Sequence, residues 1–225
     1  MAGRKIPEEQ RREAMLRAAF AVAAREGLAG VTARAVAREA GVSSGLVFFH
    51  FQSIDGLLAA LLDWILAHTF VAAELPARER PGATPGQRML AAVRRDLDAL
   101  PRARRRVELF FDYWVRGTRD PAVRDTIRRA LERYRLAFLP LAAAVVAEAP
   151  ARYGPGGAEG LATLAAALVE GCALRVVLDP AGFDAGRAMA TLAALVGGDG
   201  EGATPRHAGA GTSSFGHSRP EATGG

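Results

Sequence analysis

The segment that decides the fold spans residues 32–58 and reads TARAVAREAGVSSGLVFFHFQSIDGLL. Thr32 can N-cap a short helix that runs through Ala40, and Gly41 follows where a left-handed C-terminal residue is needed. Ser43 can then cap a second short helix, from Ser44 to about Phe51. Two short helices joined by a tight, glycine-containing turn are typical of a helix-turn-helix.

Amphipathic helices flank this segment on both sides. Residues 8–26 carry an apolar stripe at helical spacing, and Gly27 ends it. A further helix starts at Ser53 or Asp55 and has one continuous apolar face. That face consists of Leu57, Leu58, Leu61, Leu62, Ile65 and Leu66. The first fifty-odd residues therefore predict a small helical head, followed by a buried helix that leads into a larger body.

The rest of the chain predicts more helices and no strand series, so the expected fold is all-α with about nine helices. Three prolines and two glycines break the chain between Pro76 and Gly86. Helices are expected at 86–100, 104–118, 121–149, 158–178 and 184–197, with a loop at 151–157. We expect a DNA-binding head at 1–53, a ligand-binding and dimerisation body at 54–197, and a disordered Gly/Ser/Thr/Pro-rich tail at 198–225.

Composition allows a globular protein and sets limits on its class. Half of the 225 residues are hydrophobic and 24% are charged, which excludes a wholly disordered chain. The net charge of +5 permits nucleic acid as a partner, although the arginine excess equally fits a GC-rich genome. Cys172 is the sole cysteine, so an internal disulfide and a thiolate zinc site are excluded. With no signal-like start, and no apolar run longer than about a dozen residues, we expect a cytoplasmic protein without metal or cofactor.

About residues 10–62 resemble the DNA-binding module of the TetR/AcrR family. The resemblance rests on the helix cap, the turn glycine, the aromatic-His-aromatic ending at 49–51, and the Ser-x-Asp-x-Leu-Leu helix start that follows. Farther on, LFFDYWVRGTRDP at 109–121, VEGCAL at 169–174 and LDP at 178–180 are similar to the C-terminal domain of regulators grouped with the choline-responsive betaine repressor. These resemblances imply a homodimer formed by the last two helices and a ligand cavity in each body.

The chemistry of the helix-turn-helix residues suggests how they meet DNA. The second helix presents its N-terminal residues to base edges in the major groove, while the first helix holds phosphates. Arg34 occupies a position that the resemblance assigns to DNA contact, and its guanidinium can bridge guanine O6 and N7. Leu46 and Phe48 can meet thymine methyl groups. The predicted DNA-contacting residues are Thr32, Arg34, Ser43, Ser44, Gly45, Leu46, Phe48, Phe49 and His50.

Three positions depart from the family pattern and remove phosphate partners. The family commonly has Lys or Arg where this chain has Ser44, Tyr at Phe48 or Phe49, and Lys at Ile54. Binding then depends more on the other basic residues of the head, or it is weaker. Those residues are Arg4, Lys5, Arg11 and Arg38.

The body offers candidate residues for a small organic effector and for a dimer interface. An apolar pocket with a few polar groups suits such an effector, and Phe110 and Trp114 share one helix face. The full set of candidate ligand residues is Phe110, Trp114, Trp64, His68, Tyr134 and Glu170. The dimer interface is expected within residues 158–197, where the small side chains of Ala162, Ala165, Ala166 and Ala173 permit close helix approach.

Two other classes of function remain as alternatives. An enzyme has little support, because the sequence lacks H-E-x-x-H and phosphate-loop motifs, and Cys172 lies in an apolar helix. A dimeric helical protein that binds small molecules without binding DNA is the second alternative. The favoured hypothesis is a ligand-released repressor that binds a palindromic operator as a homodimer.

Overall fold

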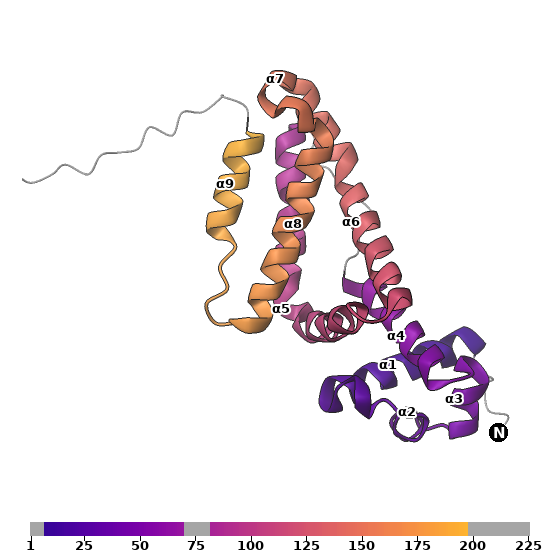
Figure 1. Ribbon diagram of the computed structural model, residues 1–225. Helices are drawn as coiled ribbons and strands as arrows, with labels where there is room; N and C mark the ends of the chain where they lie inside the picture. The colour runs from indigo at the N-terminus through magenta and orange to yellow at the C-terminus, as the bar shows by residue number, and fades with distance from the viewer. Residues whose placement is uncertain (1–6, 70–81, 198–225) are drawn as a thin grey trace, which may run out of the picture.

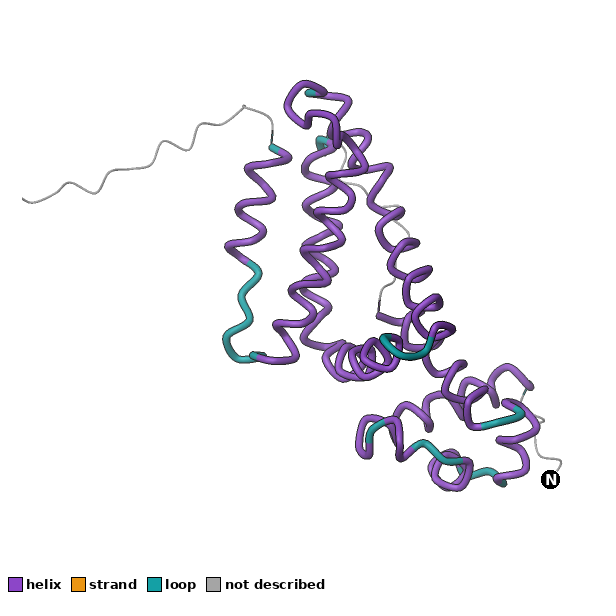
Figure 2. The backbone as a smooth tube through the Cα atoms, in the orientation of Figure 1, coloured by secondary structure: helices purple, strands orange, loops and turns teal. Residues whose placement is uncertain are grey.

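The computed structural model describes residues 7–69 and 82–197, and within these ranges the chain is helical with no strand (Figures 1 and 2). The predicted all-α fold is therefore confirmed. The α-helices are α1 (Glu8–Glu26), α2 (Ala33–Ala40), α3 (Ser44–Phe51), α4 (Ile54–Thr69), α5 (Pro85–Gly117), α6 (Pro121–Glu148), α7 (Pro150–Tyr153), α8 (Gly157–Leu178) and α9 (Gly186–Val196). Short 3₁₀ turns occupy Leu28–Gly30 and Gly154–Gly156.

The head consists of α1, α2 and α3, and its caps are those that the sequence predicts. The Thr32 hydroxyl accepts from the Ala35 amide at 3.2 Å, and the Ser43 hydroxyl accepts from the Leu46 amide at 3.2 Å. Between the two helices, Gly41 takes the left-handed conformation with φ 66°, which favours glycine. Local side-chain chemistry thus determines the angle of the helix-turn-helix.

Helix α4 connects the head to the body (Figure 1). The Ser53 hydroxyl accepts from the Gly56 amide at 2.9 Å, so Ser53 rather than Asp55 satisfies the start of this helix. The predicted apolar face of α4 is buried along its whole length. Its buried side chains are Leu57, Leu58, Leu61, Leu62, Ile65 and Leu66.

In the body, α5, α6 and α8 pack against one another, and α9 packs on α5. The prediction of two helices at 86–100 and 104–118 is wrong, because α5 runs unbroken through Pro101. Its buried face continues across the proline through Leu97, Leu100, Ala103 and Val107. The Pro101 side chain is exposed, and the packing of the buried face on either side of it outweighs the local preference of proline to end a helix.

Two further expectations are refined by the described residues. The segment expected as a loop at 151–157 contains α7 and a 3₁₀ turn. By length and composition, residues Pro150–Leu178 also pass as a membrane-spanning segment, but one face of α8 is buried in the body between α5 and α6. The predicted tail at 198–225, the prolines at 76 and 81, and the basic residues Arg4 and Lys5 lie outside the described residues.

Candidate DNA interface and effector pocket

Helix α3 turns large apolar side chains toward solvent. Phe49 is 73% exposed and Phe48 is 47% exposed, whereas Val47 and Phe51 are buried in the head. Val47 and Phe51 therefore belong to the core of the head. At the start of α3, Ser43, Ser44 and Gly45 are all exposed, and Leu46 is half-buried. One side of the helix therefore holds the head together, and the other is free for a partner.

Basic side chains lie beside this exposed face. Arg34 on α2 is exposed, and within the described part of the chain it forms no ion pair. A Cβ added at Gly45 would meet only the Ser43 hydroxyl, at 3.9 Å, so the backbone here is open to close approach. The His50 ring lies against the rings of Phe49 and Phe51, and the Arg12 guanidinium lies 5.4 Å from the centre of the Phe51 ring. The candidate DNA-contacting groups are therefore exposed at the start of α3, along its outer face and on the adjoining helix α2.

Trp64 and His68, two of the candidate effector residues, lie at the contact between α1 and α4. The Trp64 indole donates to both carboxylate oxygens of Glu13, at 3.0 and 3.1 Å, and this bond holds the pKa of Glu13 below its ordinary value. The His68 ring stacks on Trp64 with 4.3 Å between ring centres. Neither side chain lines the pocket between α5, α6 and α8 that is described next. Their contacts join α4 to the head.

The candidate effector site is a pocket of about 690 Å³ between the end of α5, α6 and α8. Its lining residues are Trp114, Gly117, Thr118, Arg124, Ile127, Arg128, Leu131, Glu132, Arg135, Thr163, Ala166, Ala167 and Glu170. The fold therefore brings together Trp114 and Glu170, which lie 56 positions apart in the chain. The Trp114 side chain is 52% exposed, which leaves part of its surface available to a ligand.

The charges of this pocket are distributed unevenly. Arg135 pairs with Glu132 at 2.7 Å and also with Glu159, and Arg128 pairs with Asp125 at 3.6 Å. In contrast, Glu170 has no hydrogen-bond or ion-pair partner among residues 7–69 and 82–197. Burial raises the pKa of the Glu170 carboxyl above its ordinary value. The pocket thus holds an unpaired carboxyl group near an aromatic face.

The two remaining candidate effector residues lie outside the pocket lining. Phe110 is 5% exposed and packs edge-on against Phe111. The Tyr134 hydroxyl donates to an Asp96 carboxylate oxygen at 2.8 Å. Burial, with the nearby charge of Asp96, raises the pKa of Tyr134 above its ordinary value. Both side chains are core residues of the body.

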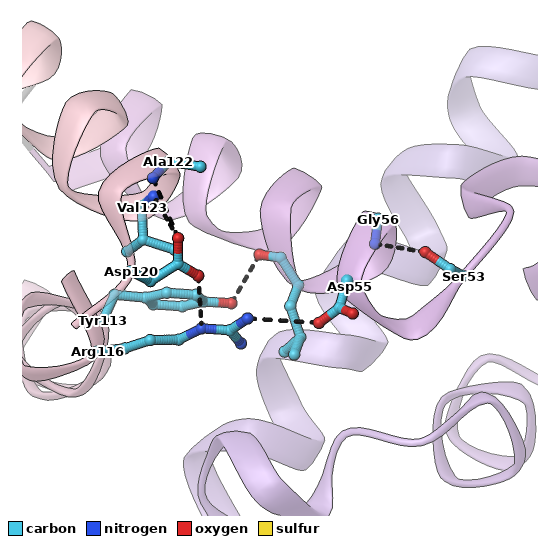
Figure 3. Close-up of polar contacts among 9 residues, drawn as sticks. Ser53, Asp55, Gly56, Tyr113, Arg116, Asp120, Ala122 and Val123 are labelled. Carbon is cyan, nitrogen blue, oxygen red and sulfur yellow. Dashed lines mark hydrogen bonds and ion pairs between the residues drawn. The ribbon is translucent and has the colours of Figure 1, made fainter.

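A polar junction joins α4 to the end of α5 and the start of α6, and no local sequence pattern predicts it (Figure 3). The buried Tyr113 hydroxyl donates to the Leu58 carbonyl of α4 at 2.8 Å. Arg116 bridges Asp55, at 3.3 Å, and Asp120, at 3.4 Å. Another oxygen of Asp120 accepts from the first amides of α6, so α4, α5 and α6 meet at this one point.

Two family descriptions match the chain. Residues 15–61 match the bacterial regulatory proteins of the tetR family, and residues 85–198 match the BetI-type transcriptional repressor C-terminal domain. The chain belongs to the TetR family. Its predicted assignment to that family, with a C-terminal domain of the BetI type, is confirmed, and it is therefore a helix-turn-helix transcription regulator and not an enzyme.

Relatives of this TetR-family regulator match most of its length. A protein of Paraburkholderia phymatum named HTH-type transcriptional regulator BetI is 29% identical over 80% of this chain and 88% of its own. One of the same name from Serratia proteamaculans is 26% identical over 80% and 87%. A structure of a putative transcriptional regulator from Saccharomonospora viridis in complex with choline has a TM-score of 0.64 at 22% identity, covering 84% of this chain and 96% of that one.

The four alanines expected at the dimer interface of this TetR-family regulator lie inside the protomer. Ala162, Ala165, Ala166 and Ala173 are at most 3% exposed and pack into the body core. The expectation that these alanines face a partner is therefore wrong. Helix α8 has two stripes without charged residues, and the alanines lie on the stripe that faces the protomer core. The other stripe faces outward. The outward stripe follows a four-three residue spacing. It consists of Gly160, Leu164, Ala167, Gly171, Leu174 and Leu178, all of them exposed.

Proposed function

We propose that this TetR-family regulator is a repressor that binds a palindromic operator as a homodimer and is released by a small organic effector. The observation that carries the proposal is the open face of α3, with exposed Ser44, Gly45 and Phe48, next to α2, whose exposed Arg34 forms no ion pair within the described residues. Residues 1–53 would bind DNA, and 54–197 would bind the effector and the partner subunit. The proposed site of action is the cytoplasm, where the operator DNA lies.

The proposed DNA contacts divide into two kinds. Ser43, Ser44 and the free amides at the start of α3 would hold phosphate, since a helix N-terminus favours an anion. Arg34 would hold guanine or phosphate, and His50 a phosphate. The remaining proposed contacts, made through backbone approach or apolar surface, are Thr32, Gly45, Leu46, Phe48 and Phe49. Because each head makes few contacts, two heads must act together on two half-sites.

The proposed homodimer uses the outward stripe of α8 together with α9. The stripe carries no charged side chain, and Leu164, Leu174 and Leu178 are 45%, 44% and 75% exposed in the single protomer. On α9, Leu195 is likewise 43% exposed. Apolar residues repeating at four-three spacing are the pattern by which two helices pack along a seam.

The proposed effector is a small organic cation. A cation binds over the face of an aromatic ring and next to a carboxylate, and the pocket offers Trp114 and the unpaired Glu170. Two of the three lining arginines are already paired with carboxylates, so they contribute little repulsion. Choline, bound by the structurally similar Saccharomonospora protein, is an ion of this class. Of the candidate residues, Trp114 and Glu170 are therefore the proposed direct contacts, with Tyr134 and Phe110 packed in the body core.

We further propose that release is a population shift. Trp114, Gly117 and Thr118 line the pocket, and Tyr113 and Arg116 of the same turns bind α4. A ligand that prefers one arrangement of these turns also selects the orientation of α4 and of the head. If that orientation misplaces the two α3 helices, operator affinity falls.

The experiment that tests this function is selection of bound sequences from random duplexes, followed by gel shifts at fixed salt. We expect an inverted repeat, and we expect Arg34→Ala and His50→Ala to weaken its binding by about tenfold or more each. Arg133→Ala is the matched control, because Arg133 is an exposed arginine of the body. Failure to enrich any sequence, or equal affinity for all four proteins, would refute DNA binding through this head.

One observation favours the alternative of a small-molecule-binding dimer without DNA activity. Helix α3 contains no lysine or arginine between Ser44 and Phe51, and Ile54 begins the next helix where the family commonly has a lysine. The same selection separates the two functions. A protein that dimerises and binds organic cations but enriches no DNA sequence would have this second function.

A further inference from the structure

The exposed face of α3 is poor in the groups that read most bases. Arginine and lysine read guanine, asparagine and glutamine read adenine, and acidic residues read cytosine. None of these occurs between Ser44 and Phe51. The polar side chains of the helix are Ser44, which is exposed, and His50, whose ring lies against two phenylalanines.

The same face exposes apolar surface that the fold does not use. Phe48 and Phe49 follow Gly45 by three and four residues, so the three positions share one side of the helix. Phe49 is 73% exposed and Phe48 is 47% exposed, although the neighbouring Val47 and Phe51 are buried. Two adjacent large apolar side chains in the second half of α3, one turn after an open glycine, form a surface suited to an apolar partner.

The surroundings of this surface indicate what that partner is. Arg34 and Arg38 are exposed on α2, which packs against α3; the one carboxylate of α2, Glu39, is paired with Arg25, and α3 itself carries no carboxylate. The charge around Phe48 and Phe49 therefore complements a polyanion and not an ordinary apolar protein surface. Within the major groove of duplex DNA, the apolar group on a base edge is the C5-methyl of thymine.

We infer that Phe48 and Phe49 are specificity-determining residues that read thymine methyl groups. The inference rests on the proposed DNA binding and goes beyond it, because it states the base composition of the half-site. The centre of each half-site is rich in T·A pairs and is read by apolar contact.

The test replaces thymine by deoxyuridine in the selected operator, which removes the C5-methyl group and keeps every hydrogen-bonding edge. Burial of one methyl group corresponds to about a fourfold change in affinity. We therefore expect about fourfold weaker binding for one substituted position, and about fifteenfold when the symmetric position of the other half-site is also substituted. The matched control places deoxyuridine at thymines that flank the selected half-sites, where α3 makes no contact. This substitution is expected to change affinity less than twofold.

A variant protein assigns the effect to these side chains. Phe48→Ala and Phe49→Ser change exposed residues, so the fold should persist, which circular dichroism checks. Both variants should bind the operator more weakly than the wild type. Each variant should bind the thymine and deoxyuridine operators equally at the position that its missing ring contacts, and should keep its thymine preference at the position that the other ring contacts.

Each other outcome overturns the inference. An enriched palindrome that the wild type binds equally with thymine or deoxyuridine overturns it and leaves the proposed function intact. Unchanged thymine preference in both variants likewise assigns the methyl contact elsewhere. No enriched palindrome at all refutes the proposed function, and the inference with it. A Phe49→Ser variant that alters oligomeric state and leaves operator affinity unchanged would show that the surface binds protein.

Discussion

The substitution Leu174→Ala tests the outward stripe of α8 without disturbing the protomer core. Leu174 is 44% exposed in the single protomer. Complete burial of a leucine side chain stabilises by about 1.5–3 kcal/mol, so the exposed part corresponds to roughly 1 kcal/mol. In a symmetric dimer each residue counts twice, and the expected loss is roughly 2 kcal/mol, or about a 30-fold rise in the dimer dissociation constant.

The assay is sedimentation equilibrium over a range of protein concentrations. Leu136→Ala is the matched control, because Leu136 is 43% exposed but lies on α6, away from the stripe. Its dimer dissociation constant should stay within about twofold of the wild type. A Leu174→Ala protein that dimerises as tightly as the wild type, or a Leu136→Ala protein that is equally weakened, would refute the assignment of the interface to this face.

Three further predictions concern the junction and the pocket. Tyr113→Phe removes the buried hydrogen bond to the Leu58 carbonyl and should lower the free energy of unfolding, measured by urea titration, by about 1 kcal/mol. A loss above about 3 kcal/mol would show that the hydroxyl does more than form this one bond. Burial in the folded state raises the pKa of Glu170, so the wild-type protein loses stability as pH rises through that pKa. Glu170→Gln should therefore be more stable than the wild type at pH 7. Thermal unfolding should show this difference vanishing below pH about 4, where the carboxyl group is protonated in both the folded and the unfolded chain. Trp114→Ala should weaken binding of choline chloride by at least about fivefold in calorimetry and keep the fold, and equal binding would place the ligand elsewhere.

The parts of the fold that depend on neighbouring residues could be predicted from the sequence. Thr32 and Ser43 cap α2 and α3 through amides three residues away, so the motif contains its own geometry. The Asp120-Pro121 start of α6 is local in the same sense. Pro101 illustrates the limit, because whether a helix continues through a proline depends on the packing of distant elements.

The site could be predicted only in part, for a related reason. Helical periodicity shows that α8 has two stripes without charge, but not which of them faces the core. The sequence alone therefore assigned Ala166 to the partner, although it is buried in the protomer and Leu174 is exposed. Trp64 and Glu13 lie 51 positions apart, and Tyr113 and Leu58 lie 55 apart. Contacts at such separations leave no local pattern, and they give Trp64 and Tyr113 roles in joining the head to the body.

The energies at the junction indicate which contact can transmit an effector signal. Allosteric coupling between two sites typically amounts to about 1–3 kcal/mol. The Asp55 side chain is 85% exposed, and an exposed ion pair contributes only about 0–1 kcal/mol, so the Arg116 bridge alone is too weak to carry such a coupling. Tyr113 is 1% exposed, and its hydroxyl donates to the Leu58 carbonyl of α4 at 2.8 Å, so this bond is shielded from water. Because Trp114 follows Tyr113 directly and lines the pocket, we expect a ligand that displaces this turn to move α4 through the Tyr113 bond.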